Sequence, residues 1–112
     1  MANEQDGIWI VDGDAKSLYA SSMMAEILGT SSAEMIGKSS FVYLFPEDVE
    51  AAQRLFDGKK RGENAPFHFR LRRQDGSETW VDVQGTPMHN ASGKFLGIVG
   101  TFTVAASRRK TG

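Results

Sequence analysis

The feature that most constrains the fold is the alternation of apolar and polar residues in the last third of the sequence. Phe67–Leu71 and Thr79–Gln84 alternate strictly, and Phe95–Val104 forms a third extended apolar segment. Because successive side chains of a strand point to opposite faces, each segment predicts a strand with one buried face. Asp75-Gly76 and Asn90–Gly93 supply the turn residues between them. The region therefore predicts an antiparallel meander of three strands.

The opening of the chain predicts a β-hairpin. Gly7–Val11 is a short apolar run, and Asp12–Asp14 stops it with residues that tolerate tight-turn backbone angles. Lys16–Ala20 can then pair back as a second strand.

Two short helical pieces follow this hairpin. Ser21 and Ser22 stand where a helix needs an N-cap, apolar residues recur at helical spacing through Met24–Leu28, and Gly29 ends the segment. Ser32 begins a second short piece that Gly37 closes. We expect both pieces to cover one face of the sheet.

A longer helix begins at Pro46, because proline is favoured at the first helical position. Val49, Ala52 and Phe56 form its apolar stripe, and Gly58–Gly62 marks its exit.

The order of these segments predicts an α+β fold, a five-stranded antiparallel sheet with short helices packed on one face. The chain has 112 residues, the length of one domain. We assign residues 7–104 to this domain, residues 1–6 to a disordered or linking N-terminus, and residues 105–112 to a C-terminal linker or tail.

Composition excludes several function classes. The net charge is -1, which gives no electrostatic footprint for nucleic acid, and the absence of cysteine excludes disulfides and thiolate chemistry. No segment has the length of a membrane-spanning helix, and residues 1–5 lack a positive region followed by an apolar stretch, so no signal peptide is expected. We expect a cytoplasmic protein in which this segment makes no membrane contact.

Several segments, in this order and at this spacing, resemble the PAS family of sensory domains. The matching segments are Leu18–Gly29, Ser31–Ser39, Phe45–Ala52, Phe69–Met88 and Gly93–Thr103. Two positions depart from the family pattern. Ser21-Ser22 stands where many members have Asn-Pro, and Val104–Ser107 stands where many have Asp-Ile-Thr.

The resemblance implies a five-stranded sheet with the first hairpin at its centre and a pocket between sheet and helices. It also implies a homodimer within a larger protein of a two-component or related system, whose output domain is a histidine kinase or a cyclase. The domain itself is expected to be a sensor without catalytic residues.

The resemblance also bears on cofactors. Ser40 stands where the blue-light members have a reactive cysteine, and Leu71, Val81 and Phe102 stand where they have flavin-binding Asn and Gln. We therefore expect no cofactor, with noncovalent flavin as an alternative. Haem is not expected, because residues 47–60 contain no histidine, and His68 and His89 have no metal-ligand spacing.

Strand parity and helical spacing select the side chains that face the expected pocket. In the meander, Leu96, Ile98 and Phe102 share the inward parity, and Gly85 and Gly100 share it too. The candidate ligand pocket consists of Trp9, Val11, Met24, Ile27, Met35, Phe41, Phe56, Leu71, Val81, Val83, Ile98 and Phe102. This apolar lining suits a small apolar ligand, and the alternative is a filled core with no ligand.

The opposite face of the sheet is the candidate dimer interface. An outward tryptophan beside arginines has the composition of interface hot spots, and the set comprises Arg70, Arg72, Trp80, Val99 and Thr101. The alternative is that a terminal segment of the same domain covers Trp80. The basic cluster Lys59–Arg61 is expected to be solvated.

Overall fold

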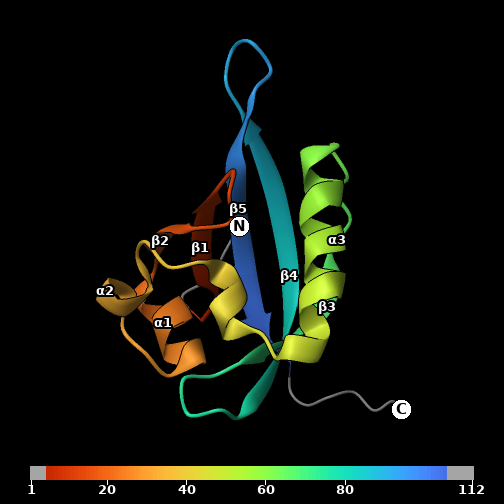
Figure 1. Cartoon of the computed structure of the whole chain (residues 1–112). Helices are drawn as coiled ribbons and strands as arrows, with labels where there is room; N and C mark the ends of the chain where they lie inside the picture. Colours follow the sequence, from red (N-terminus) through yellow and green to blue (C-terminus); the bar gives the residue numbers. More distant parts are fainter. Residues whose placement is uncertain (1–4, 106–112) are drawn as a thin grey trace.

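The computed structural model describes residues 5–105, which form a single antiparallel sheet with helices on one face (Figure 1). The strands are β1 (Gly7–Asp12), β2 (Ser17–Ala20), β3 (Phe67–Arg72), β4 (Glu78–His89) and β5 (Phe95–Val104). The helices are α1 (Ser22–Leu28), α2 (Ser32–Met35) and α3 (Val49–Lys60), with 3-10 turns η1 (Ser40–Tyr43) and η2 (Pro46–Asp48). Within residues 5–105, no helix has the length and apolar character needed to cross a membrane. The predicted α+β class and the five strands are confirmed.

The first hairpin does not lie at the centre of the sheet, so that expectation was wrong. The strand order is β2-β1-β5-β4-β3, which places β5 at the centre and β2 at one edge. The long pairing of β1 with β5, from Gly7↔Phe102 to Asp12↔Gly97, joins the first hairpin to the β3–β4–β5 meander. A turn signal specifies only that β1 and β2 are neighbours, and it carries no information on this distant pairing.

The inward parity assigned to Leu96 was also wrong, because a β-bulge interrupts β5. His89 pairs with Phe95 whereas Met88 pairs with Gly97, so Leu96 is the extra residue and is 44% exposed. Phe95 takes the inward position instead, with its ring centroid 5.8 Å from that of Phe56. Such a bulge changes which face a side chain points to, and alternation alone does not reveal it.

The predicted caps of α1 are present. Ser21 Oγ accepts from Met24 N at 3.2 Å, and it also accepts from Ile8 N at 2.9 Å. One hydroxyl therefore caps α1 and fastens it to β1. Gly29, with φ +72, ends α1 in the left-handed conformation that glycine adopts without strain.

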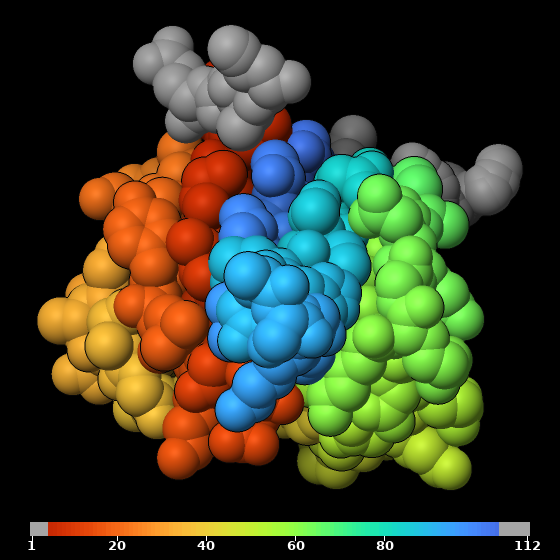
Figure 2. All heavy atoms as spheres, turned by 90° about the horizontal axis from the view of Figure 1, so that it is seen from above, coloured from red at the N-terminus to blue at the C-terminus, as the bar shows by residue number. Residues whose placement is uncertain are grey.

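The helical layer has two parts. In Figure 1, α1 and α2 lie beside β1 and β2, and α3 lies on the side of β3 and β4. Figure 2 looks down on the β4–β5 hairpin and shows the red and orange N-terminal segments on one side of it and green α3 on the other. The predicted stripe of α3 holds for Ala52 and Phe56, whereas Val49 is exposed.

Candidate ligand cavity

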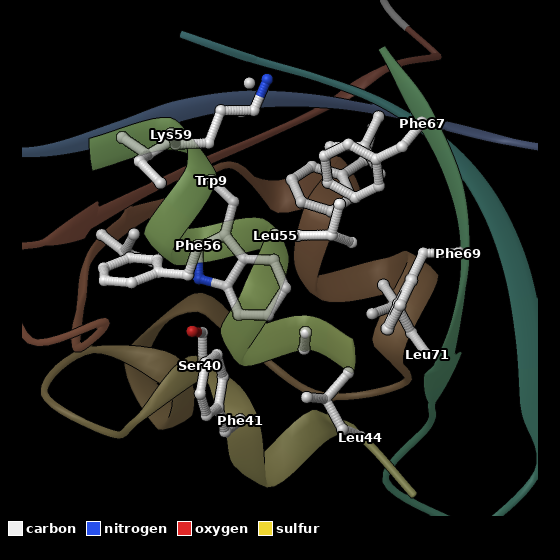
Figure 3. A pocket seen from close by; sticks show the side chains of 17 residues that line it. Trp9, Ser40, Phe41, Leu44, Leu55, Phe56, Lys59, Phe67, Phe69 and Leu71 are labelled. Atoms are coloured by element: carbon white, nitrogen blue, oxygen red, sulfur yellow. The ribbon is translucent and has the colours of Figure 1, made fainter. Parts of the chain in front are cut away.

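A cavity of about 120 Å³ lies between the sheet and α3 (Figure 3). Eight of the twelve predicted pocket residues line it: Trp9, Val11, Phe41, Phe56, Leu71, Val83, Ile98 and Phe102. Gly85 and Gly100 line it as well, in agreement with their inward parity. The structure therefore brings together most of the side chains that parity and helical spacing selected.

The other four predicted residues, Met24, Ile27, Met35 and Val81, are buried but do not line the cavity. Met24 belongs to α1 and packs against β1, where a Cβ on Gly7 would lie 2.8 Å from its Cα and Sδ atoms. The cavity lies under α3, in the other part of the helical layer. Spacing indicates that a residue faces inward, but it does not indicate which helix covers that position.

Aromatic rings make up much of the wall. The centroids of Trp9 and Phe102 lie 5.4 Å apart, and those of Phe41 and Phe56 lie 6.3 Å apart at an interplanar angle of 85°. Trp9 Nε1 donates to Ser17 Oγ at 2.8 Å, a buried bond that satisfies the polar end of the indole. Since the polar atom of Trp9 is already satisfied, this wall offers a ligand apolar contact.

Sequence reasoning did not select seven further lining residues: Ser40, Leu44, Ala52, Leu55, Lys59, Phe67 and Phe69. Phe67 and Phe69 share the inward face of β3 with Leu71, so strand alternation was the signal that could have found them. Ala52 lies on the stripe of α3 and was likewise within reach of helical spacing.

Lys59 was expected to be solvated, and that expectation was wrong. Its relative exposure is 4%, and its Nζ donates to the carbonyl of Ala65 at 3.2 Å. The stem crosses Gly85, where an added Cβ would lie 3.4 Å from Lys59 Cε. Burial lowers the pKa of Lys59, and the negative charge of Glu63 partly opposes this effect. The aliphatic stem therefore packs against Gly85 of the sheet, and the ammonium reaches the Ala65 carbonyl.

The size of the cavity limits what it can hold. A cavity of ~150 Å³ lined by apolar residues can bind benzene, whereas typical ligand pockets measure ~300 Å³ or more. At about 120 Å³, the space matches a single small ring or a short branched chain. A flavin ring system would require the walls to move apart.

The outer face of the sheet carries the predicted interface residues, but they do not form one uniform set. Trp80 is half-buried, and its ring stacks on His68 at 5.0 Å and 16°. His68 Nδ1 lies 2.8 Å from Asp82 Oδ1. Trp80 therefore points outward as predicted, with part of its cover supplied by the neighbouring strand.

Val99 and Thr101 lie on the same outer face, where they pair with Ile10 and Ile8 of β1. Both are half-buried. Arg72 is half-buried on the edge strand, where its register partner is Glu78.

Arg70 is engaged within the domain. Its guanidinium donates to Asp48 at 2.9 Å, to Glu47 at 3.1 Å and to Glu78 at 3.3 Å. Its Cζ lies 4.3 Å from the ring centroid of Phe45. The hydrogen bond to Asp48 is the main cause that raises the pKa of Arg70. Arg70 therefore fastens the start of α3 to the edge of the sheet.

The family model described as the PAS fold matches residues 1–104. The chain belongs to the PAS family. PAS domains are sensory modules that commonly dimerise and sit within larger proteins, and the domain itself is a non-catalytic unit.

Solved structures agree with this assignment. The crystal structure of the PAS domain of a protein from Colwellia psychrerythraea is 17% identical, with a TM-score of 0.83 over 92% of this chain and 88% of that one. A structure from work on a flavin analogue and the mechanism of a light-oxygen-voltage domain is 22% identical, with a TM-score of 0.77 over 92% and 78%. At these identities the likeness concerns the PAS fold alone. A search of curated proteins found no match.

Two expectations fall at the ends of the chain. Residues 1–4 of the expected N-terminal linker and residues 106–112 of the expected tail lie outside the described residues. At the boundary, Ala105 N donates to the carbonyl of Trp80 at 2.9 Å, so the chain still follows β4 there. Within residues 5–105, no three His, Asp or Glu side chains lie close enough together to hold a metal ion.

Proposed function

We propose that this PAS domain is the ligand-sensing and dimerising module of a larger, cytoplasmic signal-transduction protein with a histidine kinase or cyclase output. Its ligand is a small apolar molecule held in the cavity under α3. The observation that carries this proposal is a cavity of about 120 Å³ whose lining is largely apolar and includes several aromatic side chains. The alternative is a structural dimerisation module whose walls close on the cavity.

Signalling from such a cavity requires a difference in affinity. A ligand shifts a conformational equilibrium only if it binds one state more tightly than the other. The cavity separates α3 from β4 and β5, and its lining comes from both layers. A ligand that contacts both layers would favour one position of α3 on the sheet, and a dimer that includes the sheet would carry that change to the output domain.

The ligand test is native mass spectrometry of the purified chain, followed by titration with benzene or toluene. Retention of a small molecule, or saturable binding of either probe, supports the sensor. Failure of both, with the chain folded, supports the filled structural module instead.

Noncovalent flavin is a second candidate, favoured by the fold likeness to the light-oxygen-voltage structure. The small volume and the apolar lining oppose it, because a flavin ring needs polar partners. An absorption spectrum of freshly purified protein decides the matter. A sample with no bands beyond the aromatic region rules out flavin.

The outer sheet face is the proposed dimer contact, and it centres on Trp80 and Thr101 because Arg70 is engaged within the domain. Sedimentation should shift toward monomer for Trp80→Ala and for Thr101→Arg. Val42→Arg is the matched control, since Val42 is exposed on η1, within the helical layer. A dimer that survives both sheet variants contradicts this contact.

A further inference from the structure

The charge on Lys59 is incompletely compensated within the domain. Lys59 is 4% exposed, and its ammonium has three N–H donors. Among residues 5–105, one acceptor, the Ala65 carbonyl at 3.2 Å, lies within hydrogen-bond distance, and the Phe67 ring centroid is 5.7 Å from Nζ. Among residues 5–105, Lys59 has no carboxylate within 4.0 Å.

Glu63 supplies negative charge that acts on Lys59, yet its carboxylate is directed elsewhere. Its Oε2 lies 3.3 Å from Arg61 Nη2, and its carboxylate lies against Gly58. Glu63 attracts the ammonium from a distance without a direct ion pair. A buried cation in this situation gains from an anion that contacts it directly.

Lys59 also belongs to the cavity wall. In Figure 3 the Lys59 stem lies at the top of the view, above the rings of Trp9 and Phe56, and its ammonium is directed away from those rings. The ammonium lies near two lining residues, 5.7 Å from the Phe67 ring centroid and 3.9 Å from a Cβ built on Gly85, so the cationic group is at one end of this space. The neighbouring Lys60 is exposed and lies over the Phe56 ring, at 5.2 Å from its centroid.

We propose that the cavity ligand is a compact apolar monocarboxylate, with its ring or branched chain between the aromatic walls and its carboxylate in direct contact with Lys59. This inference rests on the proposed function, that the cavity binds a small apolar molecule, and it adds the chemical class of that molecule. The volume of about 120 Å³ sets the size of the apolar body at roughly one six-membered ring.

The test compares benzoate with the neutral benzyl alcohol, which has a ring of the same size. Both are titrated into the whole chain at neutral pH and followed by amide chemical shifts. A charge-assisted contact to Lys59 should make benzoate bind at least about tenfold more tightly than benzyl alcohol. Lys59→Met, which keeps an unbranched side chain of similar length, should abolish that preference and retain binding of benzyl alcohol.

Lys60→Met is the matched control, since it removes the same charge from the next residue, and it should leave the preference intact. Glu63→Gln provides a second variant that does not alter Lys59. It removes a competing negative charge and should strengthen benzoate binding without changing benzyl alcohol binding.

The outcomes separate this inference from the proposed function. Equal affinities for the two probes, or a preference that persists in Lys59→Met, would overturn the carboxylate inference and leave an apolar-ligand sensor standing. Binding of neither probe would overturn both. Should Lys59→Met not fold, the comparison of the two probes on the unaltered chain and on Glu63→Gln still decides between these results.

Discussion

Filling the cavity from α3 should stabilise the free domain and block its ligand. Ala52 lines the cavity, so Ala52→Leu adds three carbon atoms to that space. At ~0.8 kcal/mol per buried methylene, the transfer term is about 2.4 kcal/mol. An empty cavity of about 120 Å³ costs about 3 kcal/mol at ~24 cal/mol per Å³, which bounds the possible gain.

Adjustment of the neighbouring rings will reduce this gain, because extra carbon atoms in a packed core commonly cost ~1–3 kcal/mol in strain. We therefore expect a net increase of about 1 kcal/mol in the free energy of unfolding. Urea titration measures it, with fluorescence of the buried Trp9 as one probe. In thermal unfolding the same gain corresponds to roughly 4–8 °C in Tm.

Ala51→Leu is the matched control, because it makes the same change on the same helix at a residue that does not line the cavity. Ala52→Leu should also lose the stabilisation that toluene gives the unaltered chain. The reasoning is refuted if Ala52→Leu loses more than about 1 kcal/mol while Ala51→Leu is neutral. That result would mean that the space is not available to an added side chain.

Three further predictions concern single side chains. Arg70→Met should lower the free energy of unfolding, measured by urea titration, by about 1–2 kcal/mol, because it removes the ion pair that fastens the start of α3 to the sheet. Arg54→Met is the control: it removes an exposed ion pair with Glu50 on α3 and should cost under about 0.5 kcal/mol. Tyr43→Phe should raise the free energy of unfolding by about 1 kcal/mol, since the buried Tyr43 hydroxyl has no hydrogen-bond partner among residues 5–105. Tyr19→Phe, at an exposed position, is the control and should leave the free energy of unfolding unchanged. The pKa of Lys59 is lowered in the folded state, so the unfolded chain binds the proton more tightly. Stability should rise with pH from that lowered pKa up to the unfolded value of 10.5, and a pH series should lose this rise in Lys59→Met.

Local signals predicted the elements of this fold well. Ser21 and Gly29 cap α1 as expected, and the turn residues joined the strands in the expected places. Each of these signals acts within a few residues of the chain, so it is legible from the sequence without knowledge of the tertiary contacts.

The errors arose from strand pairing and side-chain contacts that the local pattern does not encode. The central place of β5 depends on its pairing with β1, and the exposure of Leu96 depends on a bulge opposite Met88 and His89. Arg70 has the outward parity of an interface residue, yet it lies on an edge strand and reaches the acids before α3. Alternation specifies a face and cannot specify what that face meets.

The candidate site shows the same limit. Composition indicated that Lys59 would be solvated, because charged residues are rarely buried. Its aliphatic stem lies against Gly85, on a strand distant in the sequence, where an added Cβ would be 3.4 Å from Lys59 Cε. The apolar wall could be predicted from periodicity, whereas the charged group beside it required the three-dimensional arrangement.

The central place of β5 also determines when this domain can fold. The ribosome releases β1–β2 first and β3–β4 later, and neither hairpin has its main neighbour until β5 emerges. Two-stranded hairpins are marginally stable alone, and pairing of distant segments is slow. Until its last strand arrives, the nascent chain therefore leaves unpaired the edges of β1 and β4 that β5 covers in the folded domain, and that interval is when it is most exposed to aggregation.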